Sequence, residues 1–438
     1  MSPFLGPRMS YLLRNAGLIT LKPAEIECAD LRIEAGFITD RGTRLEPGAE
    51  DELIDLDGKI VMPGLVCAHT HLYSALARGM PAPPRAPANF REILEMVWWR
   101  LDRALDEETL YWSALAGAAD AARAGTTCLY DHHSSPTRIR GSLETVREAL
   151  ENIGLRAVLC YEVTDRGGRE ERDAGVAENR AFLERTAEVK GLFRALVGAH
   201  ASFTLSASSL QACAELMQAY DTGLHIHAAE DLCDEEDAHS NYGIGVAHRL
   251  EASGCLNGRT ILAHGTHLDE KEIGIARQAG VWFAHNPRSN MNNRVGYAPV
   301  SRFGDRLVLG TDGIGADMFD EARFAFFKAR EMNPDLGADH WVRALGSTQE
   351  MASRQFGVDL ARLRPGSAAD LVVLDYRSPT PITAGNLAWH FLFGMSSACV
   401  ESVMVAGRFV VRNRQPTFGV RDIYEKARQA SQKLWAKL

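Results

Sequence analysis

The chain has 438 residues, of which 46% are hydrophobic and 24% are charged, and its formal net charge is -9. These proportions are those of a folded globular protein and exclude a fibrous or disordered chain. The acidic balance argues against a nucleic acid or an anionic membrane surface as the main partner, so a small molecule is the expected one.

The eight cysteines show no Cys-x-x-Cys spacing, and several lie in apolar runs where a reduced thiol packs as a small hydrophobic group. No apolar run reaches the roughly 18 residues that a membrane span needs. Prolines and arginines between positions 3 and 14 interrupt the N-terminus too early for a signal peptide. We therefore predict a cytoplasmic protein with no membrane partner. Met9 is a second candidate for the first residue, so the place of residues 1–8 in the native chain stays open.

Both ends of the chain are predicted to form β-structure. Near the N-terminus, Leu31 and Ile33 alternate with polar neighbours and a turn follows at 35–36, an Ala-Gly pair. Near the C-terminus, the run 403–411 has the same pattern of strand, Ala-Gly turn and strand. Each segment is too small to bury a face by itself, so we expect the two ends to pack together. The predicted domains are a composite β-sandwich of residues 1–62 and 366–420, a barrel of residues 63–365, and a C-terminal helix of residues 421–438.

Between these ends, apolar strand-like runs alternate with amphipathic helix-like segments, which is the pattern of βα units and a parallel sheet. Eight such units predict an α/β protein with a closed (β/α)8 TIM-like barrel. The first interval holds four prolines between positions 81 and 87, followed by Trp98-Trp99. This interval is either a loop that covers the barrel mouth or a helix that seals the barrel's side. The runs begin near Leu65, Thr126, Arg156, Arg194, Leu224, Thr260, Val281 and Leu307.

The strand-like runs end in polar residues, and in such barrels the active site lies at the C-terminal ends of the strands. His69 and His71 end the first run, and their side chains project the same way because side chains along a strand alternate. A lone histidine is more often a hydrogen-bonded core residue than a ligand. Several buried polar groups at neighbouring strand ends, each costly without a partner, instead predict one shared site. These groups are His69, His71, His225, His227, Glu230, His264, His285 and Asp312.

With these residues in place, the chain resembles the amidohydrolase superfamily and, within it, the cytosine-deaminase-like aminohydrolases. The resemblance spans nearly the whole chain and follows the family's order and spacing. Three further segments, at 98–102, 130–134 and 160–165, resemble the SsnA-type aminohydrolases. The motifs that carry the wider resemblance are Pro63-Gly64-Leu65 with His69-Thr70-His71, then His227-Ala228-Ala229-Glu230, then His264, and then Thr311-Asp312-Gly313.

The resemblance implies one divalent metal ion per chain, with zinc expected and ferrous iron as the alternative. Two-metal members of the superfamily use a bridging lysine at the end of strand four, where this chain has His200, so a single ion is expected. A bound divalent metal lowers the pKa of water from about 15.7 toward about 7. By resemblance the ligands are His69, His71, His227 and Asp312.

The same resemblance assigns catalytic roles to three residues. Asp312 takes the proton of the attacking water, and Glu230 shuttles protons to the ring nitrogen and the leaving amine. His264 orients the water or polarises the substrate. Weaker candidates for substrate contact are His132, His133, Glu162, Arg166, His285 and Asn290.

The predicted function is hydrolytic deamination of a small aminated nitrogen heterocycle of purine, pterin, pyrimidine or triazine type, carried out by a homo-oligomer. One alternative is hydrolytic ring opening of a cyclic amide or amidine at the same metal site. Another is a non-catalytic metal-binding protein. The latter is disfavoured, because a structural site is closed by four protein ligands and needs no acid or base such as Glu230 or His264 beside it.

Overall fold

The computed structural model describes residues 10–188, 191–332 and 335–438, so the question of the native start lies outside the described residues. The chain divides into two compact units. The first unit comprises the chain up to Val66 together with 121–128 and 317–418. The second comprises 67–120, 129–316 and 419–438. The domain limits inferred from the sequence stay a prediction.

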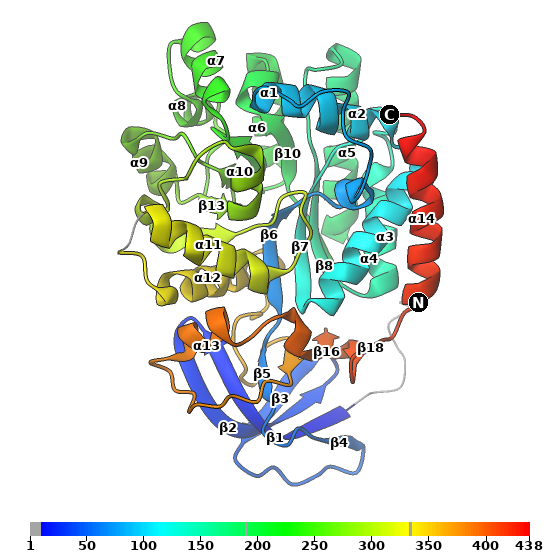
Figure 1. Cartoon of the computed structure of the whole chain (residues 1–438), viewed down its shortest axis with the longest axis vertical. Helices are drawn as coiled ribbons and strands as arrows, with labels where there is room; N and C mark the ends of the chain where they lie inside the picture. The colour runs from blue at the N-terminus through cyan, green and yellow to red at the C-terminus, as the bar shows by residue number, and fades with distance from the viewer. Residues whose placement is uncertain (1–9, 189–190, 333–334) are drawn as a thin grey trace. The chain divides into compact units, whose positions relative to one another are not determined.

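The first unit contains a nine-stranded sheet to which both ends of the chain contribute (Figure 1). Strand β5 pairs with β1 on one side and β15 on the other, so it joins the N-terminal strands to the C-terminal ones. The order is β18-β17-β16-β15-β5-β1-β2-β3, with β4 paired to β1. The strands are β1 (Ser10–Leu21), β2 (Ala24–Glu34), β3 (Phe37–Gly42), β4 (Asp51–Asp55), β5 (Ile60–Pro63), β15 (Leu371–Leu374), β16 (Val400–Val405), β17 (Arg408–Arg412) and β18 (Gln415–Pro416).

This sheet folds over onto itself around one apolar core. The rings of Tyr11 in β1 and Phe409 in β17 lie 5.3 Å apart, although three strands separate β1 from β17 in the sheet order. The two Ala-Gly turns also meet. Gly36 has a φ of 89°, and a Cβ at this position would lie 2.9 Å from the carbonyl oxygen of Ala406, so only glycine fits.

Three helices of the first unit follow the barrel strands in the chain: α11 (Met318–Met332), α12 (Ala338–Phe356) and α13 (Leu387–Phe393). Helix α12 buries Trp341, Leu345 and Ala352 on its apolar face and ends at Gly357, whose φ of 69° suits a C-terminal cap. Arg323 of α11 donates hydrogen bonds to two carbonyl oxygens at the end of α13, at 2.9 and 3.0 Å. These bonds hold the two helices together.

Eight strand runs form the barrel, and because the fourth run is split they comprise nine strands. They belong to two sheets, β6-β7-β8-β9 and β10-β11-β12-β13-β14, which two parallel bridges join: Val163 to Ala199 and Thr70 to Asp312. The ladder therefore returns to its first strand, which confirms the predicted barrel. The fourth run is split at Leu196, because β9 pairs with β8 and β10 pairs with β11. The strands are β6 (Leu65–Thr70), β7 (Thr126–His133), β8 (Arg156–Tyr161), β9 (Phe193–Ala195), β10 (Val197–Ala201), β11 (Leu224–Ala228), β12 (Ile261–His264), β13 (Trp282–His285) and β14 (Leu307–Leu309).

Helices flank these strands, as Figure 1 shows for α3 and α4 beside β7 and β8. The predicted C-terminal helix is α14, which belongs to the second unit and whose Trp435 indole donates a hydrogen bond to the Leu76 carbonyl oxygen (2.9 Å). Within the described ranges, no helix is both long and apolar enough to cross a membrane. The remaining helices are η1 (Leu72–Ala77), α1 (Phe90–Ile93), η2 (Leu94–Trp98), α2 (Trp99–Ala104), α3 (Glu107–Arg123), α4 (Ser142–Ile153), α5 (Arg169–Glu188), η3 (Ser202–Thr204), α6 (Ala207–Ala219), α7 (Leu232–Tyr242), α8 (Val246–Ala252), α9 (Glu270–Ala279), α10 (Pro287–Asn293), η4 (Val300–Arg302), η5 (Gly304–Arg306), η6 (Ser397–Cys399) and α14 (Val420–Trp435).

Two buried carboxyl groups meet at the start of α8. Glu235 accepts from the backbone N–H of Val246 (3.3 Å), and Glu272 accepts from that of Ala247 (2.9 Å). Burial, followed by the charge of Glu272, raises the pKa of Glu235 to about 8. The folded chain therefore keeps a proton that the unfolded chain loses near its usual pKa of 4.5, and stability falls as the pH rises from about 4.5 to about 8.

We expect Glu235→Gln to flatten this pH dependence, because the amide cannot ionise. Relative to the native chain, the free energy of unfolding of the variant should rise by about 2 kcal/mol between pH 5 and pH 9. This is about half of the roughly 4 kcal/mol that a full shift from 4.5 to 8 would give over this range, because solvent partly screens the pair. Urea denaturation at a series of pH values measures it. Glu236→Gln, which changes an exposed neighbour, is the matched control. Parallel curves for Glu235→Gln and the native chain would show that the pair does not titrate in this range.

Candidate active site

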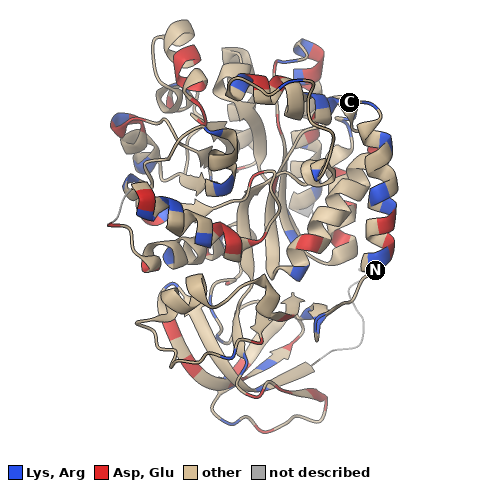
Figure 2. Cartoon of the chain, viewed as in Figure 1, with Lys and Arg blue, Asp and Glu red and all other residues tan. Residues whose placement is uncertain are grey.

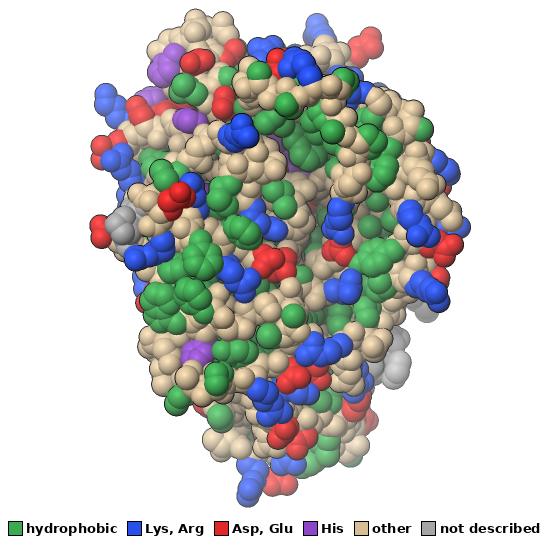
Figure 3. Space-filling model, in the orientation of Figure 1, with side chains coloured by type: hydrophobic (Ala, Val, Ile, Leu, Met, Phe, Trp, Pro, Cys, Tyr) green, Lys and Arg blue, Asp and Glu red, His purple; other side chains and the backbone are tan. Residues whose placement is uncertain are grey.

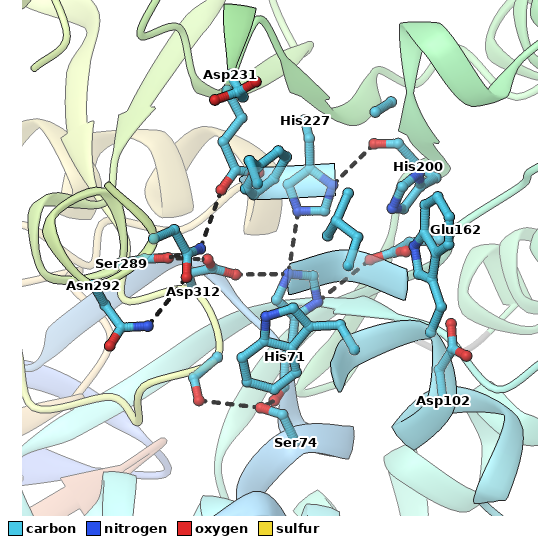
Figure 4. A pocket seen from close by; sticks show the side chains of 18 of the residues that line it. His71, Ser74, Asp102, Glu162, His200, His227, Asp231, Ser289, Asn292 and Asp312 are labelled. Carbon is cyan, nitrogen blue, oxygen red and sulfur yellow. Dashed lines mark hydrogen bonds and ion pairs between the residues drawn. The ribbon is translucent and has the colours of Figure 1, made fainter. Parts of the chain in front are cut away.

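Residues from three strand ends converge in the second unit. The Nε2 atom of His71, near the end of β6, lies 3.2 Å from Nε2 of His227 in β11 and 2.9 Å from Oδ1 of Asp312 after β14 (Figure 4). Nε2 of His69 lies 3.6 Å from the same carboxylate oxygen. All three imidazoles are buried. The structure thus brings together the four side chains that the sequence singled out as ligands.

The hydrogen bonds of these histidines set their tautomers. Nδ1 of His71 contacts the carbonyl oxygen of His132 (2.5 Å), and Nδ1 of His227 contacts that of His200 (2.9 Å). A carbonyl oxygen only accepts, so Nδ1 carries the proton in both rings and Nε2 offers its lone pair. This is the tautomer that a metal-binding histidine needs, with the other ring nitrogen held by an acceptor.

His69 is held by a histidine instead of a carbonyl group. Its Nδ1 lies 2.9 Å from Nε2 of His225, and the ring of His225 is stacked on that of His132 at 4.5 Å. When Nδ1 of His69 donates to His225, its Nε2 also offers a lone pair. That Nε2 is fully buried and has no hydrogen-bond partner among the residues that the structure describes, which is costly unless a cation takes the lone pair.

The charges of the site also favour a cation. Burial lowers the pKa of His69 to about 3 and holds that of His227 well below its usual value, so both rings are neutral, as ligands must be. Burial lowers the pKa of His71 as well, but the hydrogen bond and charge of Asp312 outweigh it and raise that pKa to about 9. The Asp312 carboxylate therefore favours a positive charge beside it. A bound metal ion would supply this charge, and His71 would then not need to be protonated.

The donor atoms are placed to form a histidine-rich metal site. Two overlapping groups of four side chains each have ligand atoms within 4.8 Å of one another. Imidazole nitrogens with one carboxylate are the donor set of catalytic zinc sites, which also leave a position for water. The fourth barrel strand contributes His200 and no lysine to this region. The two groups are His69, His71, His132 and His227, and His69, His227, His264 and Asp312.

Left-handed backbone positions aim several of the polar side chains at the site. Ala229, His264 and Asp312 have φ values of 47°, 71° and 52°, which are unfavourable for residues other than glycine and occur most often at functional sites. Glu230 follows the first of these turns, and its Oε2 lies 3.5 Å from Nε2 of His264. Burial, followed by the charge of Asp312, raises the pKa of Glu230 well above its usual value, which favours the protonated form of this carboxyl group.

One short helix orients all three of the proposed acid and base groups. Helix α10 begins at Pro287, after β13, and its polar side chains reach the ends of three other strands. Sequence reasoning missed Ser289 and Asn293, although their spacing of four residues placed them on one helix face. The contacts are Ser289 Oγ to Asp312 Oδ2, Asn290 Oδ1 to His264 Nδ1 at 2.8 Å, and Asn293 Nδ2 to Glu230 Oε1 at 3.4 Å.

These groups open into a pocket with an empty volume of about 770 Å³, including space open to solvent. His71, His227, Glu230 and Asp312 form its polar side. The segment after the prolines also lines the pocket, but its lining residues belong to the helices α1, η2 and α2 and not to a loop. Part of it is a π-helix, 94–98, a geometry frequent at functional sites. The apolar lining residues of this segment are Phe90, Leu94, Trp98 and Trp99.

Two of the weaker substrate candidates lie at or beside this pocket. Glu162 lines it, its Oε1 is 3.4 Å from Nδ1 of His71, and burial raises its pKa to about 7. Arg166 forms an ion pair with Asp102 (2.7 Å), which lines the pocket, and its guanidinium lies 4.9 Å from the ring centre of Trp99. Sequence reasoning assigned no role to Asp102.

The other four candidates are buried and are not among the residues that line the pocket. His132 stacks on His225, and Asn290 contacts His264. The remaining two are buried, with His133 hydrogen-bonded to Ser135 (2.8 Å) and the ring of His285 facing Tyr297 at 6.1 Å.

Comparison with known proteins places this geometry in a family. Residues 60–410 match the model described as the amidohydrolase family. A 5-methylthioadenosine/S-adenosylhomocysteine deaminase of Syntrophomonas wolfei is 31% identical over 98% of this chain and 100% of its own length. A 5'-deoxyadenosine deaminase of Methanopyrus kandleri is 29% identical over 92% of this chain and 91% of its own.

Solved structures share the fold. An adenosine deaminase of Xanthomonas campestris with bound zinc superposes with a TM-score of 0.85, covering 97% of this chain and 98% of its own at 23% identity. An atrazine chlorohydrolase of Arthrobacter aurescens complexed with zinc gives a TM-score of 0.83, covering 96% and 100% at 23% identity. These likenesses support the barrel described above.

Proposed function

The chain belongs to the amidohydrolase family, and from this premise we propose that it hydrolytically deaminates a small aminated nitrogen heterocycle, releasing ammonia and leaving a ring carbonyl. The observation that carries the proposal is the Glu230 carboxyl group beside His264 and Asp312 in one pocket, where burial and the charge of Asp312 raise its pKa. Relatives along nearly the whole chain are deaminases by name, which supports the same reaction class.

We propose that the site holds one divalent ion, zinc, with ferrous iron as the alternative. His69, His71 and His227 would bind it through Nε2 and Asp312 through Oδ1, the atoms that converge in the structure. When bound, such an ion lowers the pKa of water toward about 7 and so supplies a nucleophile at neutral pH.

The side chains around this position provide the proton transfers. Glu230 donates its proton to the ring nitrogen next to the amino-bearing carbon, which makes that carbon more electrophilic. Nε2 of His264, whose Nδ1 proton is held by Asn290, accepts a hydrogen bond from the attacking water. Asp312 takes the proton of that water. Glu230, now ionised, takes the proton of the newly added hydroxyl group and delivers it to the amino group. The exocyclic carbon–nitrogen bond breaks, ammonia leaves, a ring carbonyl remains, and the proton held by Asp312 returns to Glu230.

We propose a ring of purine, pterin, pyrimidine or triazine size as the substrate, with the purine class favoured because the named relatives act on adenosine derivatives. The pocket has the volume of a small-molecule site, and the Trp98 and Trp99 side chains line it with aromatic surface. Of the six proposed substrate contacts, Glu162 lines the pocket. The others are His132, His133, Arg166, His285 and Asn290.

The narrower resemblance to the SsnA-type aminohydrolases stays a prediction, as do the cytoplasmic location and the homo-oligomer. We propose that the protein does not bind nucleic acid. Its net charge is -9, and Figure 2 shows basic residues intermixed with acidic ones instead of gathered in a basic patch. A homo-oligomer is supported by exposed aromatic side chains on α11 and α13.

Hydrolytic ring opening of a cyclic amide is the competing reaction at this site, and product analysis separates the two. With a panel of aminated purines, pterins, pyrimidines and triazines, we expect one equivalent of ammonia per substrate consumed and an intact ring by mass spectrometry. A product that gains the mass of one water without ammonia release would replace deamination with ring opening.

A further inference from the structure

Four large aromatic side chains of the first unit lie half-exposed on two neighbouring helices. Phe324 and Phe327 belong to α11, and Trp389 and Phe393 belong to α13; their exposed fractions are 46–60%. We call these four residues the aromatic surface. Figure 3 shows hydrophobic side chains gathered over these helices. Scattered exposed hydrophobic residues need no explanation, but a contiguous apolar patch marks an interaction site.

The aromatic surface is already ordered in the single chain. The rings of Trp389 and Phe393 stack at 5.9 Å, and Phe327 meets the edge of Phe393 at 5.8 Å. The buried ring of Phe326 supports Trp389 and Phe393 from below, at 5.8 Å from each. Arg323 fastens α11 to the end of α13. Binding through rigid side chains loses little conformational entropy, so this surface is preorganised for a partner.

The charges of α11 indicate which partner fits. Two stripes of residues spaced by four run along the exposed side of the helix, and each has an aromatic ring between an acid and a base. The order of the charges is opposite in the two stripes. If a second α11 lies antiparallel across the first, each acid faces a base and each ring faces a ring. The stripes are Asp320–Phe324–Lys328 and Arg323–Phe327–Glu331.

A partner with charges of a single sign would meet repulsion in part of each stripe, whereas a second copy of this chain matches both. Such a patch, complementary to itself, is what a two-fold symmetric interface requires. Within one chain the charges are balanced by partly exposed pairs along the helix, Asp320 with Arg323 (2.7 Å) and Lys328 with Glu331 (2.8 Å). Pairs three residues apart on a helix surface contribute little to stability, so exchanging partners across the interface costs little.

We propose that the aromatic surface is the centre of an interface between two copies of the chain, related by a two-fold axis with their α11 helices antiparallel. Four aromatic side chains at about half exposure offer roughly 400 Å² of apolar surface per copy. A stable interface buries about 800 Å² per partner, with an apolar centre and a polar rim, so the patch has the size of such a centre. The proposal deepens that of a homo-oligomer and does not depend on the reaction.

Sedimentation velocity of the full chain over a range of concentrations tests the interface. We expect a dimer for the native chain and a monomer for Phe327→Asp, with a dimer dissociation constant raised by roughly 100-fold or more. Leu53→Asp is the matched control, because Leu53 is equally exposed (52%) but lies on β4. A native chain that stays monomeric at every concentration, or a Phe327→Asp chain that stays dimeric, would overturn the proposal.

A charge exchange tests the antiparallel orientation. Asp320→Lys should weaken the dimer, since it would face Lys328 of the second copy, and Asp320→Lys combined with Lys328→Asp should restore it. Failure of the double variant to restore the dimer would overturn this orientation. Ammonia release measured on the same samples separates this inference from the proposed function. Deamination by a native chain that stays monomeric would contradict the proposed interface but not the proposed reaction. A dimer without hydrolase activity would contradict the proposed reaction but not the interface.

Discussion

Replacing Glu230 with glutamine is expected to lower turnover by about 10²–10⁴-fold while the protein keeps one metal ion per chain. Glutamine preserves the size of the side chain and its contact with Asn293 but cannot carry a proton between ring nitrogen and leaving amine. Glu230 lies three residues beyond His227, after the left-handed turn at Ala229, and contacts His264 instead of the converging Nε2 atoms. The loss should therefore fall on the chemical step and not on the ion.

Steady-state kinetics and elemental analysis of the same preparation measure this result. Glu236→Gln is the control, because Glu236 is exposed on α7 and does not line the pocket, so both turnover and metal content should match the native chain. Near-normal turnover of Glu230→Gln would remove the residue from the mechanism. Loss of the ion in that variant would instead make Glu230 a ligand.

Replacing His69 and His71 together with alanine is expected to abolish both metal binding and turnover. The two substitutions remove two of the four converging donors and leave His227 and Asp312, too few to hold an ion in a catalytic site of three or more protein ligands. The native chain purified without chelator should contain one divalent ion. The double variant should contain essentially none, with its circular dichroism spectrum unchanged.

His239→Ala is the control for this experiment, since His239 is largely exposed and belongs to neither group of potential ligands. Its metal content and turnover should be those of the native chain. Two tightly bound ions per native chain, or full metal content in the double variant, would contradict the single site.

Sequence periodicity predicted the barrel and the end of its strands at which the active site lies. Eight apolar runs separated by helical segments predict parallel βα units, and the alternation of side chains places His69 and His71 on one side of their strand. Buried polar groups recurring at strand ends identify those ends as a shared site, since each is costly to bury alone. The paired Ala-Gly turns indicated that the two chain ends form β-structure of one kind. All of these signals are local, which is why they can be read along the chain.

Only the tertiary structure decided which distant groups meet. The bridge from Thr70 to Asp312 closes the barrel, and the contacts of α10 bring Ser289 to Asp312 and Asn293 to Glu230. Sequence spacing places a side chain on a face of its own element, but it does not give the distance to a side chain on another element. Those distances depend on strand register, on backbone turns and on the packing of the whole unit. The half-exposed rings of α11 and α13 likewise emerge only after folding, because burial is a property of the packed molecule.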